Sequence, residues 1–200
     1  MILYHYSVDS YQSGGHLIND FKKQFRFAEP YLLALEKSQD CFWSVFFASM
    51  ALSRELCALK LRKYENYVKD AVEGIFEFVR QQEFPGRSVS RVGCVYYCSS
   101  QAEALAYLQD DCLASGDFAP EQVKLLEVQV ADETVFQYDQ AFFNKATDIM
   151  ETSRDLDAVF SLARAYFSLE RSQEPLPEIL SDGQNEILRE IQIKENKTDL

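Results

Sequence analysis

Helical periodicity is concentrated in residues 29–84, and this concentration limits the fold more than any other feature of the chain. Strand-like runs lie on both sides of it, at residues 2–6, 91–98, 123–130, 134–138, 176–180 and 186–193. One further helical pattern covers residues 154–167. Strands at both ends of the chain and helices gathered in its first half predict an α+β fold, not the regular alternation of strand and helix of an α/β fold.

Local signals refine this prediction at three places. Ser100 with Glu103 three residues later forms a capping-box pattern, so a helix is expected directly after the strand at 91–98. Asp40 is a candidate N-cap for the long helix that follows it. Residues 181–183, Ser-Asp-Gly, have turn chemistry and predict a hairpin of the two last strands.

Length and composition fit one folded unit. The chain has 200 residues, 47% of them hydrophobic, which is enough for one well-filled core. We therefore expect residues 1–200 to form a single domain, with residues 29–84 as a helical insert after the first strand. The net charge of -12 disfavours a protein that binds by neutralising many phosphates, so nucleic acid is an unexpected ligand.

Other classes of protein are disfavoured by what the sequence contains. No run approaches the roughly 20 apolar residues that span a bilayer, and the first residues lack a secretion signal, so we expect no membrane contact and a cytoplasmic location, or action inside another cell after delivery as an effector. The five cysteines show no Cys-x-x-Cys spacing and there are only two histidines. No metal site is expected.

Three short patterns place a chemically capable side chain inside a strand-like apolar run. They are His5 within residues 3–7, Tyr96 within residues 95–99 and Glu178 within residues 177–180. Each has a purely structural alternative, since a strand histidine is often a hydrogen-bonded core residue, a strand tyrosine usually packs, and Glu178 could be a solvated edge residue. The three are informative only as one constellation.

The order and setting of these three elements resemble the ADP-ribosyltransferase superfamily of the His-Tyr-Glu type. The resemblance implies split antiparallel β-sheets with an inserted helical lobe, and NAD as a substrate. It also implies that Glu178 stabilises the positive charge that develops on the ribose, that His5 holds the adenosine-side ribose, and that Tyr96 stacks on nicotinamide.

The remaining site residues follow from the same resemblance. Tyr6 occupies the position whose backbone holds the nicotinamide carboxamide, where many relatives have glycine, and Ser7 completes this strand motif. Tyr97 is the alternative stacking residue, because neighbouring strand residues face opposite ways. Arg91 is a candidate for the pyrophosphate, with pairing to a carboxylate as its structural alternative.

A narrower resemblance covers most of the chain. Residues 76–80, 84–85, 90–91 and 165–167, followed by Glu178, are similar to a bacterial family called DUF2441. This narrower family implies no activity. The functional expectation therefore rests on the superfamily likeness alone.

The leading hypothesis is an NAD-dependent ADP-ribosyltransferase whose acceptor the sequence does not identify. Acidity favours a protein or small-molecule acceptor over nucleic acid. The alternatives are a non-catalytic module that binds NAD or another nucleotide, and an interaction protein that docks through the helices of residues 29–84. A Cys-His hydrolase is disfavoured, because neither histidine has a glycine-framed cysteine as neighbour.

Overall fold

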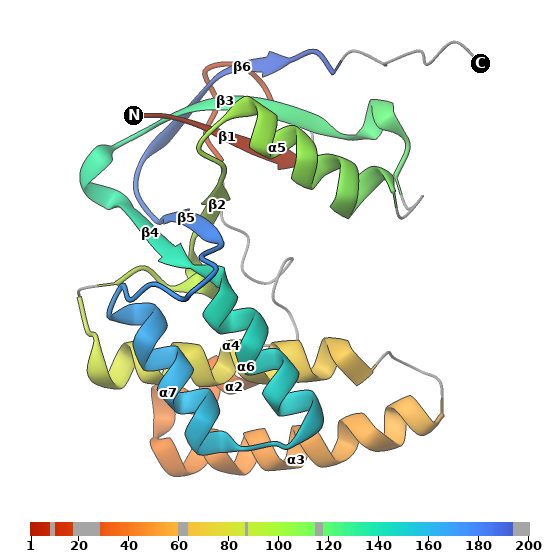
Figure 1. Ribbon diagram of the computed structural model, residues 1–200, viewed down its shortest axis with the longest axis vertical. Helices are drawn as coiled ribbons and strands as arrows, with labels where there is room; N and C mark the ends of the chain where they lie inside the picture. The colour runs from red at the N-terminus through yellow and green to blue at the C-terminus, as the bar shows by residue number, and fades with distance from the viewer. Residues whose placement is uncertain (9–10, 18–28, 60–63, 87, 115–117, 194–200) are drawn as a thin grey trace. The chain divides into compact units, whose positions relative to one another are not determined.

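The computed structural model describes the chain except residues 9–10, 18–28, 60–63, 87, 115–117 and 194–200, and except the side chains of 29, 53–54, 56–58, 64–67 and 111. The chain forms two compact units. Unit 1 comprises Met1–Asn19, Val95–Phe136 and Glu178–Leu200, and unit 2 comprises Asp20–Cys94 and Gln137–Pro177. The described residues contain six α-helices and two three-stranded sheets, which is an α+β fold as predicted (Figure 1).

Unit 1 is built on an antiparallel sheet of order β1-β3-β6, formed by β1 (Ile2–Ser7), β3 (Lys124–Val130) and β6 (Asn185–Ile191). The predicted alternation on β3 is confirmed, because Leu126, Val128 and Val130 are buried whereas Gln129 is exposed. Leu125 is buried as well, in a second cluster to which helix α5 (Gln101–Leu108) contributes. Both faces of this sheet therefore carry apolar residues.

The second sheet has the order β2-β5-β4, with β2 (Val95–Tyr97), β5 (Pro177–Ser181) and β4 (Val135–Asp139). The predicted hairpin of the last two strands is wrong. Strand β5 pairs with β2, whereas β6 pairs with β3 and places Ile187 opposite Val128. Burial of these side chains contributes more free energy than the local turn preference of residues 181–183. The turn therefore leads the chain from one sheet into the other.

Two boundaries differ from the expected ones. The strand predicted for residues 91–98 is limited to β2, and Arg91–Gly93 forms a 3-10 turn. The N-cap of α3 (Gln39–Ala58) is Ser38, whose Oγ accepts from the Cys41 amide at 3.2 Å, and not Asp40, which lies in the first turn.

The predicted start of α5 is confirmed. Ser100 Oγ accepts from the Glu103 amide at 3.2 Å, as a capping box requires. The reciprocal bond is shifted by one residue, since the Glu103 carboxylate accepts from the amide of Ser99 at 2.8 Å and from its hydroxyl at 2.7 Å. This helix therefore begins immediately after β2.

Unit 2 is helical. It contains α2 (Glu29–Lys37), α3, α4 (Tyr64–Glu83), α6 (Gln140–Thr152) and α7 (Leu156–Phe167), so it includes two helices beyond the residues predicted for the helical lobe. The apolar face predicted for α4 is confirmed, because Val68, Val72, Ile75, Phe76 and Val79 are fully buried. Phe76 contacts the rings of Phe143 on α6 and Tyr166 on α7.

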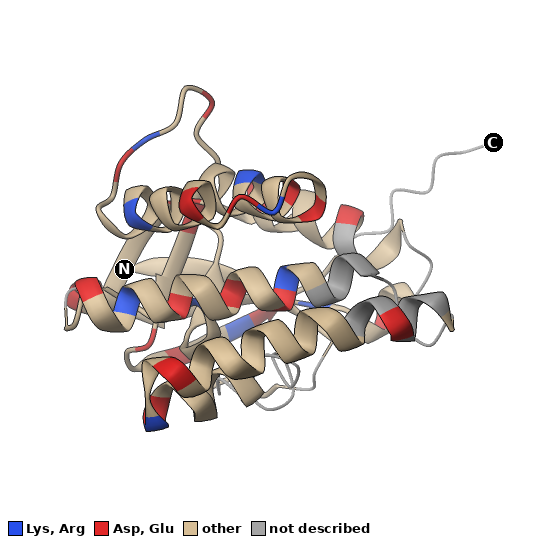
Figure 2. Ribbon diagram, turned by 90° about the horizontal axis from the view of Figure 1, so that it is seen from below, with Lys and Arg blue, Asp and Glu red and all other residues tan. Residues whose placement is uncertain are grey.

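Charged residues are spread over these helices. Figure 2 shows acidic and basic positions interspersed along the described helices rather than gathered on one of them. None of the described helices is long and apolar enough to cross a membrane.

Candidate functional site

The candidate site lies in unit 1, where β1 approaches β2. Tyr4 and Cys98 form an isolated antiparallel bridge, with N–H···O distances of 3.0 and 2.8 Å. One residue further along β1, His5 Nδ1 lies 2.8 Å from the carbonyl oxygen of Tyr96. A carbonyl can only accept, so Nδ1 carries a proton and donates in this bond.

The two tyrosines of β2 face opposite ways. Tyr97 is buried in the cluster of Leu3, Val95 and Ile179, and its ring meets the His5 ring edge-on with centroids 6.1 Å apart. Tyr96 is half-buried on the other face of the strand. His5 therefore contacts the side chain of one tyrosine and the backbone of the other.

Glu178 is the second residue of β5 and is 6% exposed. In the β2–β5 register Tyr97 is opposite Ile179 and Tyr96 is opposite Leu180. Residues two apart share a face, so Glu178 lies on the face of Leu180 and Tyr96. The three predicted elements thus lie on β1, β2 and β5, of which β2 pairs with β5 and, through Cys98 at its end, bridges to β1. Because side chains alternate between the two faces of a strand, Tyr96 shares a face with Glu178, whereas Tyr97 lies on the opposite face and contacts His5.

The two residues that follow His5 are half-buried on β1, where Tyr6 is opposite Leu125 and Ser7 opposite Lys124 of β3. The peptide groups of Tyr4 point to the β2 side of the strand, as its bridge with Cys98 shows. Because strand peptides alternate in direction, those of Tyr6 point to the same side.

Arg91 lies in unit 2 and is 4% exposed. Its guanidinium donates to the Glu73 carboxylate at 3.0 and 3.1 Å and to the Tyr166 hydroxyl at 3.0 Å, and it lies 4.0 Å from the centre of the Phe143 ring. The arrangement is the carboxylate pairing that the sequence left open as the alternative to pyrophosphate binding. The other six candidate residues belong to unit 1.

A sequence model of the family described as "Protein of unknown function (DUF2441)" matches residues 10–194. The chain belongs to the DUF2441 family. A comparison with curated proteins finds no match. The family description attaches no activity to this DUF2441 protein, so its function has to be argued from its own residues.

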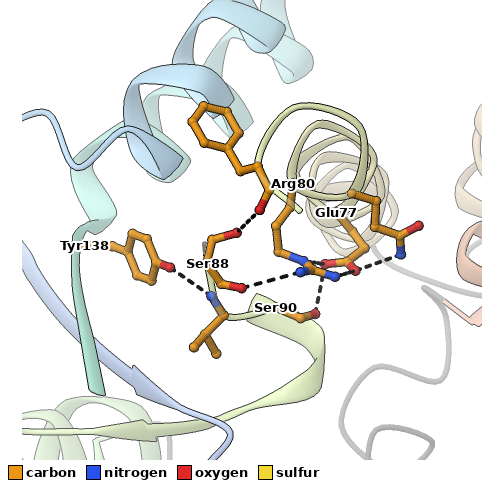
Figure 3. A network of polar contacts seen from close by, with 8 residues as sticks. Glu77, Arg80, Ser88, Ser90 and Tyr138 are labelled. Carbon is orange, nitrogen blue, oxygen red and sulfur yellow. Dashed lines mark hydrogen bonds and ion pairs between the residues drawn. The ribbon is translucent and has the colours of Figure 1, made fainter. Parts of the chain in front are cut away.

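Polar residues that the sequence did not single out are buried in unit 2 of the DUF2441 protein. Glu73 and Glu77 are 3% and 5% exposed on the apolar face of α4. Glu77 accepts from Arg80 at 2.7 and 2.9 Å and from Ser90 at 2.8 Å (Figure 3). Two glutamates at i and i+4 on the apolar face of a helix were the signal that could have found this network, because buried carboxylates need hydrogen-bond or ion-pair partners.

The same network holds the segment that leads into β2. Arg80 donates to the carbonyl oxygen of Ser88 at 3.4 Å, and the Val89 amide donates to the Tyr138 hydroxyl at 3.0 Å (Figure 3). The chain from Ser88 to Cys94 is therefore fixed by side chains of α4 and β4 before it reaches the strand of Tyr96.

Asp139, at the end of β4, is fully buried and accepts only from groups of unit 2. Its Oδ1 accepts from the amides of Ala141 at 3.1 Å and Leu176 at 2.9 Å, and its Oδ2 accepts from the Ser172 amide at 2.7 Å. Burial acts to raise the pKa of Asp139, but these amide hydrogen bonds outweigh it, so the pKa lies below its usual value. Neither the helix that Asp139 caps nor its bonds to residues 33 and 37 positions away were predicted from the sequence.

Among the residues that the structure describes, no group of three or more His, Cys, Asp or Glu side chains could hold a metal ion.

Proposed function

We propose that this DUF2441 protein is an NAD-dependent ADP-ribosyltransferase, on a fold like that of the His-Tyr-Glu superfamily. The observation that carries the proposal is the hydrogen bond from His5 Nδ1 to the carbonyl oxygen of Tyr96, 2.8 Å, which joins β1 to β2, the strand that pairs with the strand of Glu178. His5, Tyr96 and Glu178 come from three distant parts of the sequence and belong to one compact unit.

His5 would hold a ribose of NAD. Its Nδ1 donates to the Tyr96 carbonyl, and in the neutral form of such a ring Nε2 is an acceptor. Sugar hydroxyls are donors that suit this nitrogen. The bond to Tyr96 also fixes the ring plane, which lowers the entropic cost of using the histidine for binding.

An aromatic ring of β2 would stack on nicotinamide. Tyr96 is half-buried and shares its face with Glu178, whereas Tyr97 is buried against His5. We assign the stacking role to Tyr96, because its ring is partly accessible to a ligand. The peptide of Tyr6 would hold the carboxamide, and its larger side chain would narrow the pocket compared with glycine.

Glu178 would act on the reacting centre. The bond between ribose C1′ and the nicotinamide nitrogen breaks, nicotinamide leaves with the electron pair, and positive charge develops on the sugar as in glycoside hydrolysis. A preorganised carboxylate stabilises this charge by about 3 kcal/mol when it lies in a water-poor site. The acceptor oxygen or nitrogen then bonds to C1′ and releases its proton to Glu178 or to water.

The acceptor is a protein side chain or a small molecule in this proposal. The net charge of -12 raises the cost of bringing a polyanion close to the protein, which disfavours nucleic acid.

Calorimetric titration of NAD tests the binding step. We compare the wild type with His5→Asn, which keeps a donor for the Tyr96 carbonyl but lacks Nε2, and with His16→Ala as the matched control, since His16 is the second of two histidines and is exposed. Saturable binding that weakens at least tenfold in His5→Asn and is unchanged in His16→Ala supports the site. Absence of binding at 1 mM NAD, weaker than about -4 kcal/mol, refutes it.

Release of nicotinamide tests the chemical step. Glu178→Gln keeps the size of the side chain and removes its charge, and Glu186→Gln is the control because Glu186 is exposed on β6. We expect Glu178→Gln to lower the release rate by about 100-fold or more, in line with loss of a preorganised charge. Equal rates for the two variants would exclude a catalytic Glu178 and leave the non-catalytic, NAD-binding alternative.

An interaction module is the second candidate, and one observation favours it. Leu33, Phe47 and Leu52 on α2 and α3 are 51%, 57% and 53% exposed. Leu33 also lines a cavity of about 400 Å³ between the two helices, together with Ala34 and Val45 among others. If the protein binds no NAD, this apolar surface is the candidate site for binding another protein.

A further inference from the structure

We infer that Asp139 is a positioning residue that fixes the backbone immediately before Glu178, an inference that rests on the proposed function of Glu178. Asp139 is fully buried, and among the described residues the groups that donate to it are backbone amides rather than cationic side chains. A buried carboxylate is costly unless its hydrogen bonds are well placed. Capping α6 through Ala141 uses only one of the three amide bonds.

The other two bonds bind the connection between α7 and β5 from both ends. The Ser172 amide donates to Oδ2 at 2.7 Å and the Leu176 amide donates to Oδ1 at 2.9 Å. The next residue after Asp139 adds a bond in the other direction, since the Gln140 amide donates to the Leu176 carbonyl at 2.8 Å. Leu176 is thus held through both its N–H and its C=O.

Glu178 follows Leu176 by two residues. On its other side, Ile179 pairs with β2 and lies opposite Tyr97. The chain thus runs from Leu176, whose backbone is held by Asp139 and Gln140, through Pro177 and Glu178 to the point where β5 pairs with β2. A catalytic side chain has to be held within roughly 0.5 Å of its working position, so loss of either support should be felt at the carboxylate.

The two carboxylate oxygens of Asp139 accept from different amides, so a substitution of nearly the same size can remove part of these bonds. In Asp139→Asn one end of the side chain becomes an NH₂ group, which cannot accept from the Ser172 or Leu176 amide. Asp139→Ser keeps an oxygen that caps α6 but has one acceptor in place of two. Asp155→Asn is the matched control, because Asp155 caps α7 through the Ala158 amide and is exposed.

The first measurement is amide hydrogen exchange and amide chemical shift by NMR at Ser172, Leu176 and Glu178. We expect exchange to speed up at least tenfold at Ser172 or Leu176, whichever amide loses its acceptor, in both Asp139 variants, with a shift of the Glu178 signal, and no change there in Asp155→Asn. Unchanged exchange, or an unmoved Glu178 signal, would overturn the inference. This measurement needs no NAD and decides the anchor even if the wild type releases no nicotinamide, a result that would refute the proposed function separately.

The second measurement is nicotinamide release by the same variants. A misplaced Glu178 should lower kcat about tenfold with the KM for NAD changed less than twofold, because the anchor acts on the reacting centre and not on the ribose or nicotinamide contacts. Faster exchange with an unchanged kcat would show that Asp139 only stabilises the fold and would overturn the positioning role.

Discussion

Two glutamates on helix α4 make the same kind of contact in opposite environments, and their comparison predicts how much burial matters for an ion pair. Glu73 pairs with Arg91 through two hydrogen bonds of 3.0 and 3.1 Å, with side chains 3% and 5% exposed. Glu83 pairs with Arg164 through three contacts of 2.8–3.0 Å, with side chains 36% and 50% exposed. Only their exposure differs strongly.

The predicted costs differ accordingly. Glu73→Gln leaves the Arg91 charge buried without a full counter-charge, which should lower the free energy of unfolding by about 3–5 kcal/mol. Glu83→Gln removes a solvated pair, so the loss should be about 0.2–1 kcal/mol, even though Arg164 holds the pKa of Glu83 below its usual value. With a urea dependence of about 2 kcal/mol per molar, the midpoint should fall by about 2 M in the first variant and by less than about 0.5 M in the second.

Fluorescence of the single tryptophan is a suitable assay, because Trp43 packs against Phe78 and Phe160 within unit 2 and therefore reports on the unit that contains both pairs. Urea unfolding of the two variants and the wild type gives the midpoints. A Glu73→Leu/Arg91→Met double variant removes both charges and should recover most of the loss, which also covers the case that Glu73→Gln fails to fold. Equal midpoints for Glu73→Gln and Glu83→Gln would refute the reasoning.

Three further predictions concern stability. The wild type should lose stability as pH falls below about 4, because the pKa of Asp139 is lower in the folded than in the unfolded chain; acid unfolding of Asp139→Asn should show a weaker dependence in this range. Leu126→Ala, at a fully buried position of the β1-β3-β6 sheet, should cost about 2–5 kcal/mol in thermal or urea unfolding, and a loss under 1 kcal/mol would contradict the described core. Gly183→Ala should lower the free energy of unfolding by about 1–3 kcal/mol in calorimetry, because the new methyl group would collide with Thr134. The Thr134 hydroxyl is hydrogen-bonded to Ser181 and to the Ala131 carbonyl, and an unchanged stability would show that Thr134 can move aside.

The candidate site was predictable in part. His5, Tyr96 and Glu178 each interrupt an apolar strand-like run, and that local contrast is visible in the sequence. Their assembly on neighbouring strands was an expectation from resemblance. The distribution of the two tyrosines between His5 and Glu178 depends on the β1–β2 bridge and the β2–β5 register, which are pairings between residues some 80 or more positions apart.

The sequence by itself determined the α+β class, the apolar faces of β3 and α4 and the start of α5, because periodicity and capping act within a few residues. Only the tertiary structure decided that β5 and β6 separate into different sheets, that Arg91 is buried against Glu73, and that Asp139 anchors Leu176. These outcomes depend on which distant groups are buried together. A buried polar group needs a hydrogen-bond partner, and the tertiary structure decides which group lies within reach.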